Sequence, residues 1–484
     1  MLKLNDATLF RQQCLIDGQW LAADQGGTIV ISNPATGESL GSVPKMGAGE
    51  TRRAIAAADA ALPGWRARTA AERGRLLRRW YELMLANQDD LALIMTSEQG
   101  KPLSEAKGEI AYAASYLEWF AEEGKRAYGE IIPPNGSDRR LLVTHAPVGV
   151  CAAITPWNFP AAMITRKAGA ALAAGCTMVL KPASQTPFSA LALAELAQRV
   201  GIPAGVFNVV TGAARAIGGE ICANPVVRKL SFTGSTEIGS QLIAQCATTV
   251  KKLSMELGGN APFIVFGDAD LDAAVVGAMA SKYRNAGQTC VCANRLLVQD
   301  GVYDEFAAKL ARAVAQLKVG NGVEPGVTQG PLIDAAALAK VEELVADAVG
   351  KGARDVCGGK AHALGRSFFE PTILADVTPE MRVAREEIFG PVAPLFRFKD
   401  EAQAIAMAND TEFGLASYFY ARDVGRIFRV SEALEYGMVG VNTGLISTEI
   451  APFGGVKSSG LGREGSRHGL DDYLELKYVC VAGL

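Results

Sequence analysis

One cysteine and one glutamate are the residues of this chain that are best suited to chemistry. Cys290 lies in residues 287–292 (GQTCVC), among small and polar neighbours, and Glu256 lies 34 residues upstream, in residues 255–259 (MELGG). A cysteine attacks as the thiolate, so a local device must remove its proton. The chain has three histidines, and none is near either segment in sequence. The sequence therefore favours a cysteine–carboxylate mechanism over a cysteine–histidine one.

The cysteines give little support to a metal site. Cys290 and Cys292 form a C-x-C pair that no second cysteine or histidine pair complements, whereas a tetrahedral zinc site needs four ligands. We therefore expect no metal. The nine cysteines have no repeating spacing, and residues 1–6 lack the apolar core of a secretion signal. These features predict reduced thiols and a cytoplasmic location.

Length and composition limit the partners of the protein. With 484 residues, 49% of them apolar and 20% charged, the chain should be globular and have two or three domains. The net charge of −3 provides no basic surface for nucleic acid. No apolar run approaches the ~18 residues that a membrane span requires. We expect a small-molecule ligand, and neither nucleic acid nor a membrane as partner.

An alternation of apolar runs and helical patterns predicts the scaffold that positions these residues. The predicted strands after residue 147 are 148–154, 177–182, 206–210, 227–232, 261–265 and 295–299. The predicted helices between and after them are 161–175, 187–200, 213–223, 270–285 and 302–317. Such alternation is typical of parallel sheets covered on both faces, so we predict an α/β fold with two such units.

The first part of the chain has a different pattern. Residues 15–45 read as hairpin strands, and an alanine-rich helical pattern covers 49–85 with a break predicted at residues 63–64 (PG). Two further helices are predicted over 87–97 and 103–126, and a strand over 141–144.

Three turns after predicted strands are candidates for ligand contacts. The glycine turn in residues 232–239 opens a helix and would suit a phosphate, but its G-x-x-x-x-G spacing departs from the dinucleotide fingerprint, and it can equally be an ordinary turn. Lys181 ends a buried strand, where it would pair with ribose or phosphate or simply be solvated. Asn158 would donate to an oxyanion or serve as a turn residue.

Six motifs together resemble the NAD(P)-dependent aldehyde dehydrogenase superfamily. In chain order they are residues 155–160 (TPWNFP), 181–184 (KPAS), 232–235 (FTGS), 255–259 (MELGG), 287–290 (GQTC) and 386–392 (EEIFGPV). The resemblance covers nearly the whole chain in the order and spacing of the family. It implies a Rossmann-like cofactor domain, an α/β catalytic domain, and a β oligomerisation arm with a C-terminal tail. The corresponding residues are 1–124 with 147–258, then 259–455, then 125–146 with 456–484.

The resemblance also implies a two-stage oxidation. Cys290 attacks the aldehyde carbonyl, and the Asn158 amide and the backbone N–H of Cys290 hold the oxyanion. Hydride leaves to the nicotinamide and a thioester remains. Glu256 then activates the water that releases the carboxylate. A cysteine hydrolase or acyltransferase would not need the cofactor motifs, and a non-catalytic relative would be expected to lack Cys290 or Glu256.

The cofactor positions of the family carry over to a defined set. These residues are Thr155, Pro156, Trp157, Asn158, Lys181, Ala183, Ser184, Gly234, Ser235, Leu257, Glu387 and Phe389. NAD-preferring members tend to have a glutamate where Ser184 stands, which would repel a 2′-phosphate, whereas Lys181 would attract one. We therefore expect NADP to be accepted and preferred, with NAD as the second cofactor.

Substrate choice is expected to depend on Arg166, Arg284 and Ser447. Within the superfamily the chain most resembles the members that oxidise succinate semialdehyde to succinate, through residues 163–167 (MITRK), Arg284, residues 290–292 (CVC) and residues 444–447 (GLIS). Two guanidinium groups and a hydroxyl suit a distal carboxylate. The arginines can instead be exposed or ion-paired. Glutarate semialdehyde, or a broader range of aldehydes, is the alternative substrate, because one methylene discriminates weakly.

Two further expectations concern regulation and assembly. Cys292 is either a redox partner of Cys290 or a buried neutral thiol. The family usually forms homodimers or homotetramers, and the apolar residues 141–144 and the alternating residues 474–479 would suit intersubunit strands.

Overall fold

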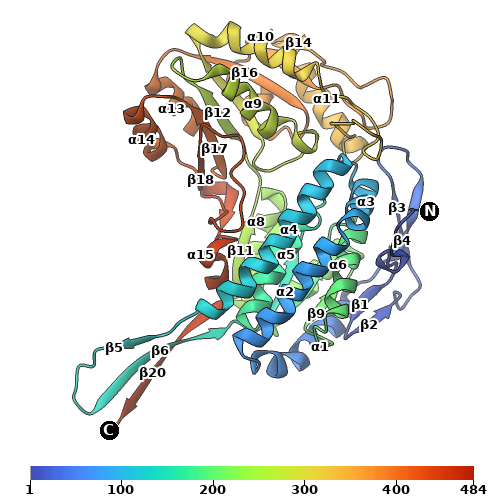
Figure 1. The fold of residues 1–484 in the computed structure, drawn as a ribbon, viewed down its shortest axis with the longest axis vertical. Helices are drawn as coiled ribbons and strands as arrows, with labels where there is room; N and C mark the ends of the chain where they lie inside the picture. Colours follow the sequence, from blue (N-terminus) through green and yellow to red (C-terminus); the bar gives the residue numbers. More distant parts are fainter. Residues whose placement is uncertain (1, 484) are drawn as a thin grey trace.

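The fold of residues 2–483, which the computed structural model describes, has two lobes and a projecting arm (Figure 1). The lower lobe is built on a sheet of strand order β19-β11-β10-β7-β8-β9-β1-β2. Its strands are β1 (Cys14–Ile16), β2 (Gln19–Leu21), β7 (Val150–Ile154), β8 (Thr177–Lys181), β9 (Phe207–Val209), β10 (Val227–Thr233), β11 (Lys252–Glu256) and β19 (Gly460–Leu461). Strands β7 to β11 pair in parallel, and β1, β2 and β19 add antiparallel edges.

Helices cover both faces of this sheet because its central strands are apolar on both sides. Cys151 and Ala153 of β7 face one helical layer, and Val150 and Ala152 face the other. The first layer contains α2 (Ala70–Ala86), α3 (Gln88–Gln99), α4 (Leu103–Glu123), α5 (Ala162–Ala174) and α6 (Pro187–Arg199). The second contains α1 (Ala48–Arg66), α7 (Ala214–Ala223) and α8 (Thr236–Cys246).

The order of the parallel strands creates a switch point between β7 and β10. The chain runs from β7 outward through β8 and β9, and then returns to place β10 and β11 on the other side of β7. Ligands bind at such switch points, beyond the carboxyl ends of the strands. The turns after Ile154 and Thr233 therefore open at the position where a ligand is expected.

The upper lobe has a second sheet of strand order β14-β15-β16-β13-β12-β17-β18, parallel except at β14. Its strands are β12 (Ala261–Val265), β13 (Ala293–Gln299), β14 (Arg354–Cys357), β15 (Thr372–Ala375), β16 (Val392–Phe398), β17 (Ala416–Tyr420) and β18 (Met438–Val441). Its helices are α9 (Leu271–Lys282), α10 (Tyr303–Val314), α11 (Ala335–Gly350), α12 (Arg382–Arg385), α13 (Glu401–Asn409) and α14 (Val424–Ala433).

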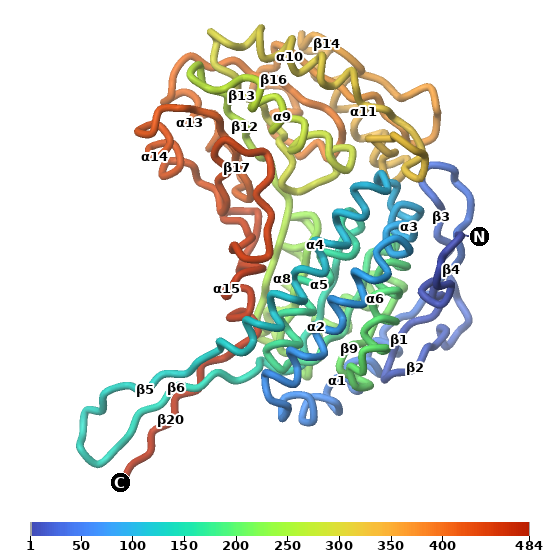
Figure 2. Tube along the Cα trace, in the orientation of Figure 1, coloured from blue at the N-terminus to red at the C-terminus, as the bar shows by residue number. Residues whose placement is uncertain are grey.

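The arm joins segments from distant parts of the chain. Strands β5 (Glu130–Ile132) and β6 (Arg139–Pro147) form a hairpin, and β20 (Leu474–Ala482) pairs with β6 along its full length. Figure 2 shows the last part of the chain, in red, running past α15 (Ser466–Asp471) into the arm. The remaining hairpin is β3 (Thr28–Ser32) with β4 (Ser39–Pro44). Short 3-10 helices occupy Ala7–Leu9, Gly124–Arg126, Ala247–Thr249, Arg284–Gly287, Asp300–Val302 and Lys457–Ser459.

The α/β fold and the two parallel-sheet units predicted from the sequence are confirmed. The break predicted at residues 63–64 is wrong, because α1 continues through Pro63 to Arg66. Pro63 lies in the last turn of the helix, where few further helical hydrogen bonds are lost. No helix within residues 2–483 is both long and apolar enough to cross a membrane.

Candidate active site

Two cavities, each of about 260 Å³, meet at Cys290. Cys290 and Met163 line both of them. We call one the charged cavity, because arginine, lysine and glutamate side chains line it, and the other the turn-lined cavity, because the turns after β7 and β10 open into it. A group bound in either cavity therefore lies next to the sulfur.

The loop that carries Cys290 has an unusual backbone. Asn285, Ala286 and Gly287 all have positive φ angles, of 54°, 54° and 73°. A Cβ atom at Gly287 would lie 2.1 Å from the carbonyl oxygen of Gly390, so the close approach of these two segments requires glycine. The left-handed turn redirects the chain between α9 and β13, which places Cys290 at the amino end of β13.

The surroundings of Cys290 do not by themselves produce a thiolate. Burial raises the pKa of the thiol to about 12, and the neighbouring carboxylates Glu387 and Glu256 act in the same direction. The positive charge of Arg166 opposes them in part. A base or an added positive charge is therefore needed before the sulfur becomes nucleophilic.

Glu256 ends β11 as a buried carboxyl without hydrogen bonds. Its side chain is 2% exposed, and neither carboxyl oxygen has a partner among the described residues. Burial raises its pKa well above the usual value, and the neighbouring Glu464 adds to the shift, while Arg166 and Lys167 oppose it. A carboxyl with a raised pKa is a stronger base, once ionised, than an ordinary carboxylate. Glu256 does not itself line either cavity.

Asn158 lies in the turn between β7 and α5, buried beside the cysteine loop. Its Nδ2 donates to the carbonyl oxygen of Gln288 at 2.9 Å, and it lines the turn-lined cavity together with Cys290. Within residues 2–483 the second Nδ2 hydrogen has no acceptor. This hydrogen can be donated to an oxygen bound next to the sulfur.

The turn-lined cavity combines the carboxyl ends of the first sheet with the amino ends of the second. Its lining residues are Pro156, Trp157, Asn158, Met163, Thr233, Gly234, Ser235, Leu257, Gly258, Cys290, Ala337, Lys340, Glu387, Ile388 and Phe389. Ser235 caps α8, and its Oγ accepts from Ile238 N–H at 3.4 Å. The buried hydroxyls of Thr155 and Thr233 have no partner in the described chain. A helix N-terminus and unpaired hydroxyls suit a phosphorylated dinucleotide.

The upper lobe contributes Glu387 and Phe389 to this cavity. Gly259 N–H donates to Glu387 Oε1 at 3.1 Å, and burial raises the pKa of this carboxyl to about 7. The ring of Phe389 meets that of Trp157 edge to face, with centroids 5.5 Å apart. Lys340 of α11 also lines this cavity. It was not predicted from the sequence, because it lies in no recognised motif.

Thr155, Lys181, Ala183 and Ser184 lie beside the turn-lined cavity and are not among its lining residues. Thr155 N–H donates to the Lys181 carbonyl at 3.1 Å, so the ends of β7 and β8 are adjacent. Burial lowers the pKa of Lys181 to about 8. Its Nζ has no acceptor or carboxylate partner within the part of the chain described, so a bound anion can still pair with it.

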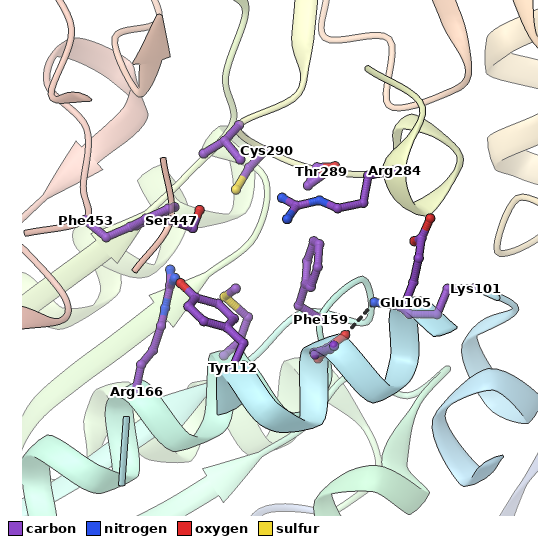
Figure 3. Close-up of a pocket in the computed structure, with 14 residues that line it drawn as sticks. Lys101, Glu105, Tyr112, Phe159, Arg166, Arg284, Thr289, Cys290, Ser447 and Phe453 are labelled. Atoms are coloured by element: carbon purple, nitrogen blue, oxygen red, sulfur yellow. Dashed lines mark hydrogen bonds and ion pairs between the residues drawn. The ribbon is translucent and has the colours of Figure 1, made fainter. Parts of the chain in front are cut away.

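The charged cavity receives side chains from both lobes (Figure 3). Its lining residues are Lys101, Glu105, Gly108, Glu109, Tyr112, Phe159, Met163, Arg166, Arg284, Thr289, Cys290, Val291, Ser447 and Phe453. Figure 3 shows the Arg284 guanidinium extending toward Cys290 and the Arg166 guanidinium rising from α5 toward Ser447. The three residues predicted to bind a distal carboxylate are therefore brought together.

Arg166 is both ion-paired and directed into the cavity. Its Nε faces Glu464, and its guanidinium carbon lies 4.2 Å from the centroid of the Phe453 ring. Its Nη1 and Nη2 have no hydrogen-bond partner among residues 2–483. The two alternatives for this arginine, an ion pair and a ligand contact, are thus compatible.

The polar residues that α4 and the segment before it contribute to this cavity were not predicted from the sequence. Lys101 precedes α4, and Glu105, Glu109 and Tyr112 follow on α4 itself. The spacing i, i+4, i+7 of the last three places them on one face of the helix. That pattern was the available signal, although it is equally typical of a solvated helix face.

Cys292 turns away from both cavities. It is buried, and its Sγ lies 3.4 Å from the carbonyl oxygen of Lys282. The described cysteines are all free. A disulfide between Cys292 and Cys290 would require the loop to rearrange, and the redox partnership stays a prediction. No group of three potential metal ligands occurs within residues 2–483.

Comparison with known proteins gives consistent matches over the full length. A family model described as "Aldehyde dehydrogenase family" matches residues 20–479. The chain is 71% identical over 483 residues to glutarate-semialdehyde dehydrogenase of Pseudomonas aeruginosa, with 100% of both chains covered. It is also 71% identical over 480 residues to the NADP(+) succinate-semialdehyde dehydrogenase of Escherichia coli, covering 99% of this chain and 100% of the relative.

Solved structures match equally well. The crystal structure of an E. coli NADP dependent enzyme has a TM-score of 0.99 at 71% identity, with coverage of 99% and 100%. The succinate-semialdehyde dehydrogenase from Burkholderia pseudomallei has a TM-score of 0.99 at 66% identity, with the same coverage.

Proposed function

The chain belongs to the aldehyde dehydrogenase family, and we propose that it oxidises succinate semialdehyde to succinate with NADP as electron acceptor. The observation that supports this substrate is the convergence of Arg166, Arg284 and Ser447 on the cavity beside Cys290. Guanidinium groups form charge-assisted, bidentate contacts with carboxylates. An aldehyde with a carboxylate at its far end can thus hold its carbonyl near the sulfur.

The proposed chemistry assigns one task to each of three residues. Once the Cys290 thiol has released its proton to solvent, the sulfur bonds to the aldehyde carbon. The resulting oxyanion of the thiohemiacetal accepts from the free Nδ2 hydrogen of Asn158 and the backbone N–H of Cys290. Loss of hydride converts the adduct to a thioester. Glu256 then removes a proton from water, and attack of that water breaks the C–S bond and releases the carboxylate. A donor aimed at an oxyanion contributes about 3 kcal/mol to such a step.

The turn-lined cavity and the adjoining end of β8 would hold the dinucleotide. When bound, NADP supplies the hydride acceptor. Trp157, Phe389 and Glu387 surround the cavity next to Cys290, which suits the nicotinamide end. Lys181 and Ser184 would receive the 2′-phosphate, because one is a cation and the other carries no opposing charge. NAD would fit the same site without that contact.

Glutarate semialdehyde is the second candidate substrate. It carries the same two functional groups, and relatives named for either substrate are 71% identical to this chain. One methylene changes binding in a pocket by only about 1–3 kcal/mol. We propose that both are oxidised.

The test is a substrate panel. The values of kcat/KM with NADP are measured for succinate semialdehyde, glutarate semialdehyde and butanal, which has four carbons and no carboxylate. We expect kcat/KM for both carboxylated aldehydes to exceed that for butanal by about 10²-fold, because charge-assisted contacts contribute about 3 kcal/mol. Equal values for all three would refute the assignment of the charged cavity.

We further propose that the protein is a homodimer or homotetramer that assembles through the arm. Ile131, Leu476 and Tyr478 of the arm are 79%, 71% and 62% exposed, and strands with exposed apolar side chains pair readily. Light scattering of the parent and of Leu476→Lys would test the assembly.

The lower sheet with its helices would be the cofactor-binding domain, and the upper sheet with its helices would be the catalytic domain.

A further inference from the structure

We propose that Lys101 is a positioning residue for the Asn158 amide, and that it acts together with Glu109. The pair, which we call the Lys101–Glu109 clamp, holds the turn between β7 and α5 at Asn158 and at the start of α5. This inference rests on the proposed role of Asn158 as the oxyanion donor. It gives a task to a buried ion pair that the chemistry described above does not use.

The first part of the clamp is the ammonium group of Lys101. Its Nζ donates to Glu109 Oε2 at 2.5 Å and to the carbonyl oxygen of Asn158 at 2.8 Å, and it lies 4.1 Å from the centroid of the Phe159 ring. An ammonium has three hydrogens, and these three contacts occupy them. Lys101 therefore acts through Asn158 and does not bind the aldehyde itself. Figure 3 labels Lys101, and the dashed line there marks its ion pair with an unlabelled carboxylate, which is Glu109 by the contact above.

The second part is the other carboxyl oxygen of Glu109. Glu109 Oε1 accepts from the backbone N–H groups of Ala161 and Ala162, at 2.9 and 3.3 Å. These groups lie at the start of α5, whose own N-cap, Ala161, offers no side-chain acceptor. Glu109 thus replaces the missing cap from a neighbouring helix. Lys101 and Glu109 together fix the turn at Asn158 and at the backbone of Ala161 and Ala162.

A second donor holds the same carbonyl from the cysteine loop. Asn285 Nδ2 donates to Asn158 O at 3.0 Å and to Gln288 O at 3.2 Å. The Asn158 side chain in turn donates to Gln288 O. The Asn158 amide and the cysteine loop are therefore linked by hydrogen bonds. The clamp determines the position of Asn158 relative to that loop. A displacement of about 1 Å at such a position can lower a rate by about 10²-fold.

Stability alone does not account for the clamp. Both side chains are 1% exposed, and a buried ion pair is often no more stabilising than an apolar pair of the same size. What the charges provide is directed hydrogen bonding to Asn158 O and to the first N–H groups of α5. An apolar pair would fill the space without fixing the amide.

The test uses the double variant Lys101→Met/Glu109→Gln in the full-length enzyme. Removing both charges avoids leaving Glu109 as a buried unpaired carboxylate, and the amide oxygen that Glu109→Gln introduces still accepts from Ala161 and Ala162. We expect kcat for succinate semialdehyde to fall by about 10- to 100-fold, with little change in KM. Lys107→Met is the matched control, because Lys107 lies on α4 in a surface pair with Asp89, and it should retain parent activity.

Alkylation of Cys290 by iodoacetamide separates positioning of the amide from general damage. This reaction uses the same thiolate but develops no carbonyl oxyanion, so its rate should be the same in the double variant and the parent. A parallel fall in both rates would show that the cysteine loop itself had been disturbed, and would overturn the proposal.

A cycle with Asn158→Ala decides whether Lys101 acts through Asn158. Asn158→Ala alone should lower kcat by about 10²- to 10³-fold. In that background the clamp variant should reduce kcat by less than about threefold, because the group that it positions is already absent. If the two effects multiply instead, the clamp does not act through Asn158. If Asn158→Ala alone leaves kcat unchanged, it is the proposed oxyanion role that fails.

Discussion

The two cavities that meet at Cys290 have similar volumes but are built differently. The turn-lined cavity is formed mainly by backbone turns at strand ends, with Asn158, Gly234 and Glu387 following or preceding strands. The charged cavity is formed mainly by long side chains, with Arg166 on α5, Glu109 on α4 and Arg284 in the cysteine loop.

This difference separates the part of the site that binds features common to both dinucleotides from the part that selects the aldehyde. Turns at a switch point hold the invariant parts of a dinucleotide through backbone groups, so they tolerate little change. Side chains projecting from helices can be exchanged without altering the sheets. We propose that the charged cavity determines which aldehyde is oxidised, whereas the turn-lined cavity and the adjoining end of β8 hold the cofactor.

Removal of the residue that both cavities share should have the largest effect. Cys290→Ala should lower kcat with any aldehyde by more than about 10⁴-fold, because no other group can form the thioester. The affinity for NADP, measured by fluorescence quenching, should stay close to that of the parent. Substantial residual oxidation of aldehydes by this variant would show that the reaction does not depend on the Cys290 sulfur.

A change confined to the charged cavity comes next in size. Arg284→Met should lower kcat/KM for succinate semialdehyde by about 10- to 100-fold, since a hydrogen bond to a charged group contributes about 1.5–3 kcal/mol. The value for butanal should hardly change. We choose Arg284 because substitution of Arg166 would also remove an ion-pair partner of Glu464. A matching loss with butanal would contradict the separation of the two cavities.

A substitution beside the turn-lined cavity should change only the cofactor preference. Ser184→Glu should lower the ratio of kcat/KM for NADP to that for NAD by about 10- to 100-fold, because a carboxylate would repel the 2′-phosphate. Ser184→Ala, which adds no charge, serves as the control. The preference among aldehydes should be the same in all three proteins, and a shift in it would mean that the cavities are coupled.

The smallest expected effect is a pH dependence of cofactor binding. Burial raises the pKa of Glu387 to about 7, so the carboxyl is ionised above that pH and protonated below it. The ionised form accepts stronger hydrogen bonds from hydroxyl groups. KM for NADP should therefore rise by up to about tenfold from pH 8 to pH 6, and Glu387→Gln should show a flat profile. A pH dependence retained in that variant would point to another group.

The two cavities also differed in how well the sequence predicted them. The turn-lined cavity was largely predictable because its residues lie in short contiguous motifs, each of which follows or precedes a strand. Thr155, Lys181, Ala183 and Ser184 were expected with them, and the structure places these four just outside the lining. Lys340 was missed because it stands alone on α11.

The charged cavity was predicted less completely for a physical reason. Charged residues such as Lys101 and Glu109 are rarely buried, and a helical spacing does not show which neighbour covers a helix face. The ion pair of Arg166 with Glu464 joins residues almost 300 positions apart. Such partners follow from the packing of α5 against the last part of the chain, which no local pattern reveals.

The position of β20 near the end of the chain means that the strands of the arm are synthesised at widely different times. This strand pairs with β6 along nine residues, yet Leu474 follows Pro147 by 327 positions (474 − 147). At ribosomal speeds of about 5–20 residues per second, the β5–β6 hairpin emerges about 15–65 seconds before its partner strand. During that interval the edge of β6 is open to other nascent chains. Chains translated side by side on one messenger thus have an interval in which swapped or premature pairing can occur.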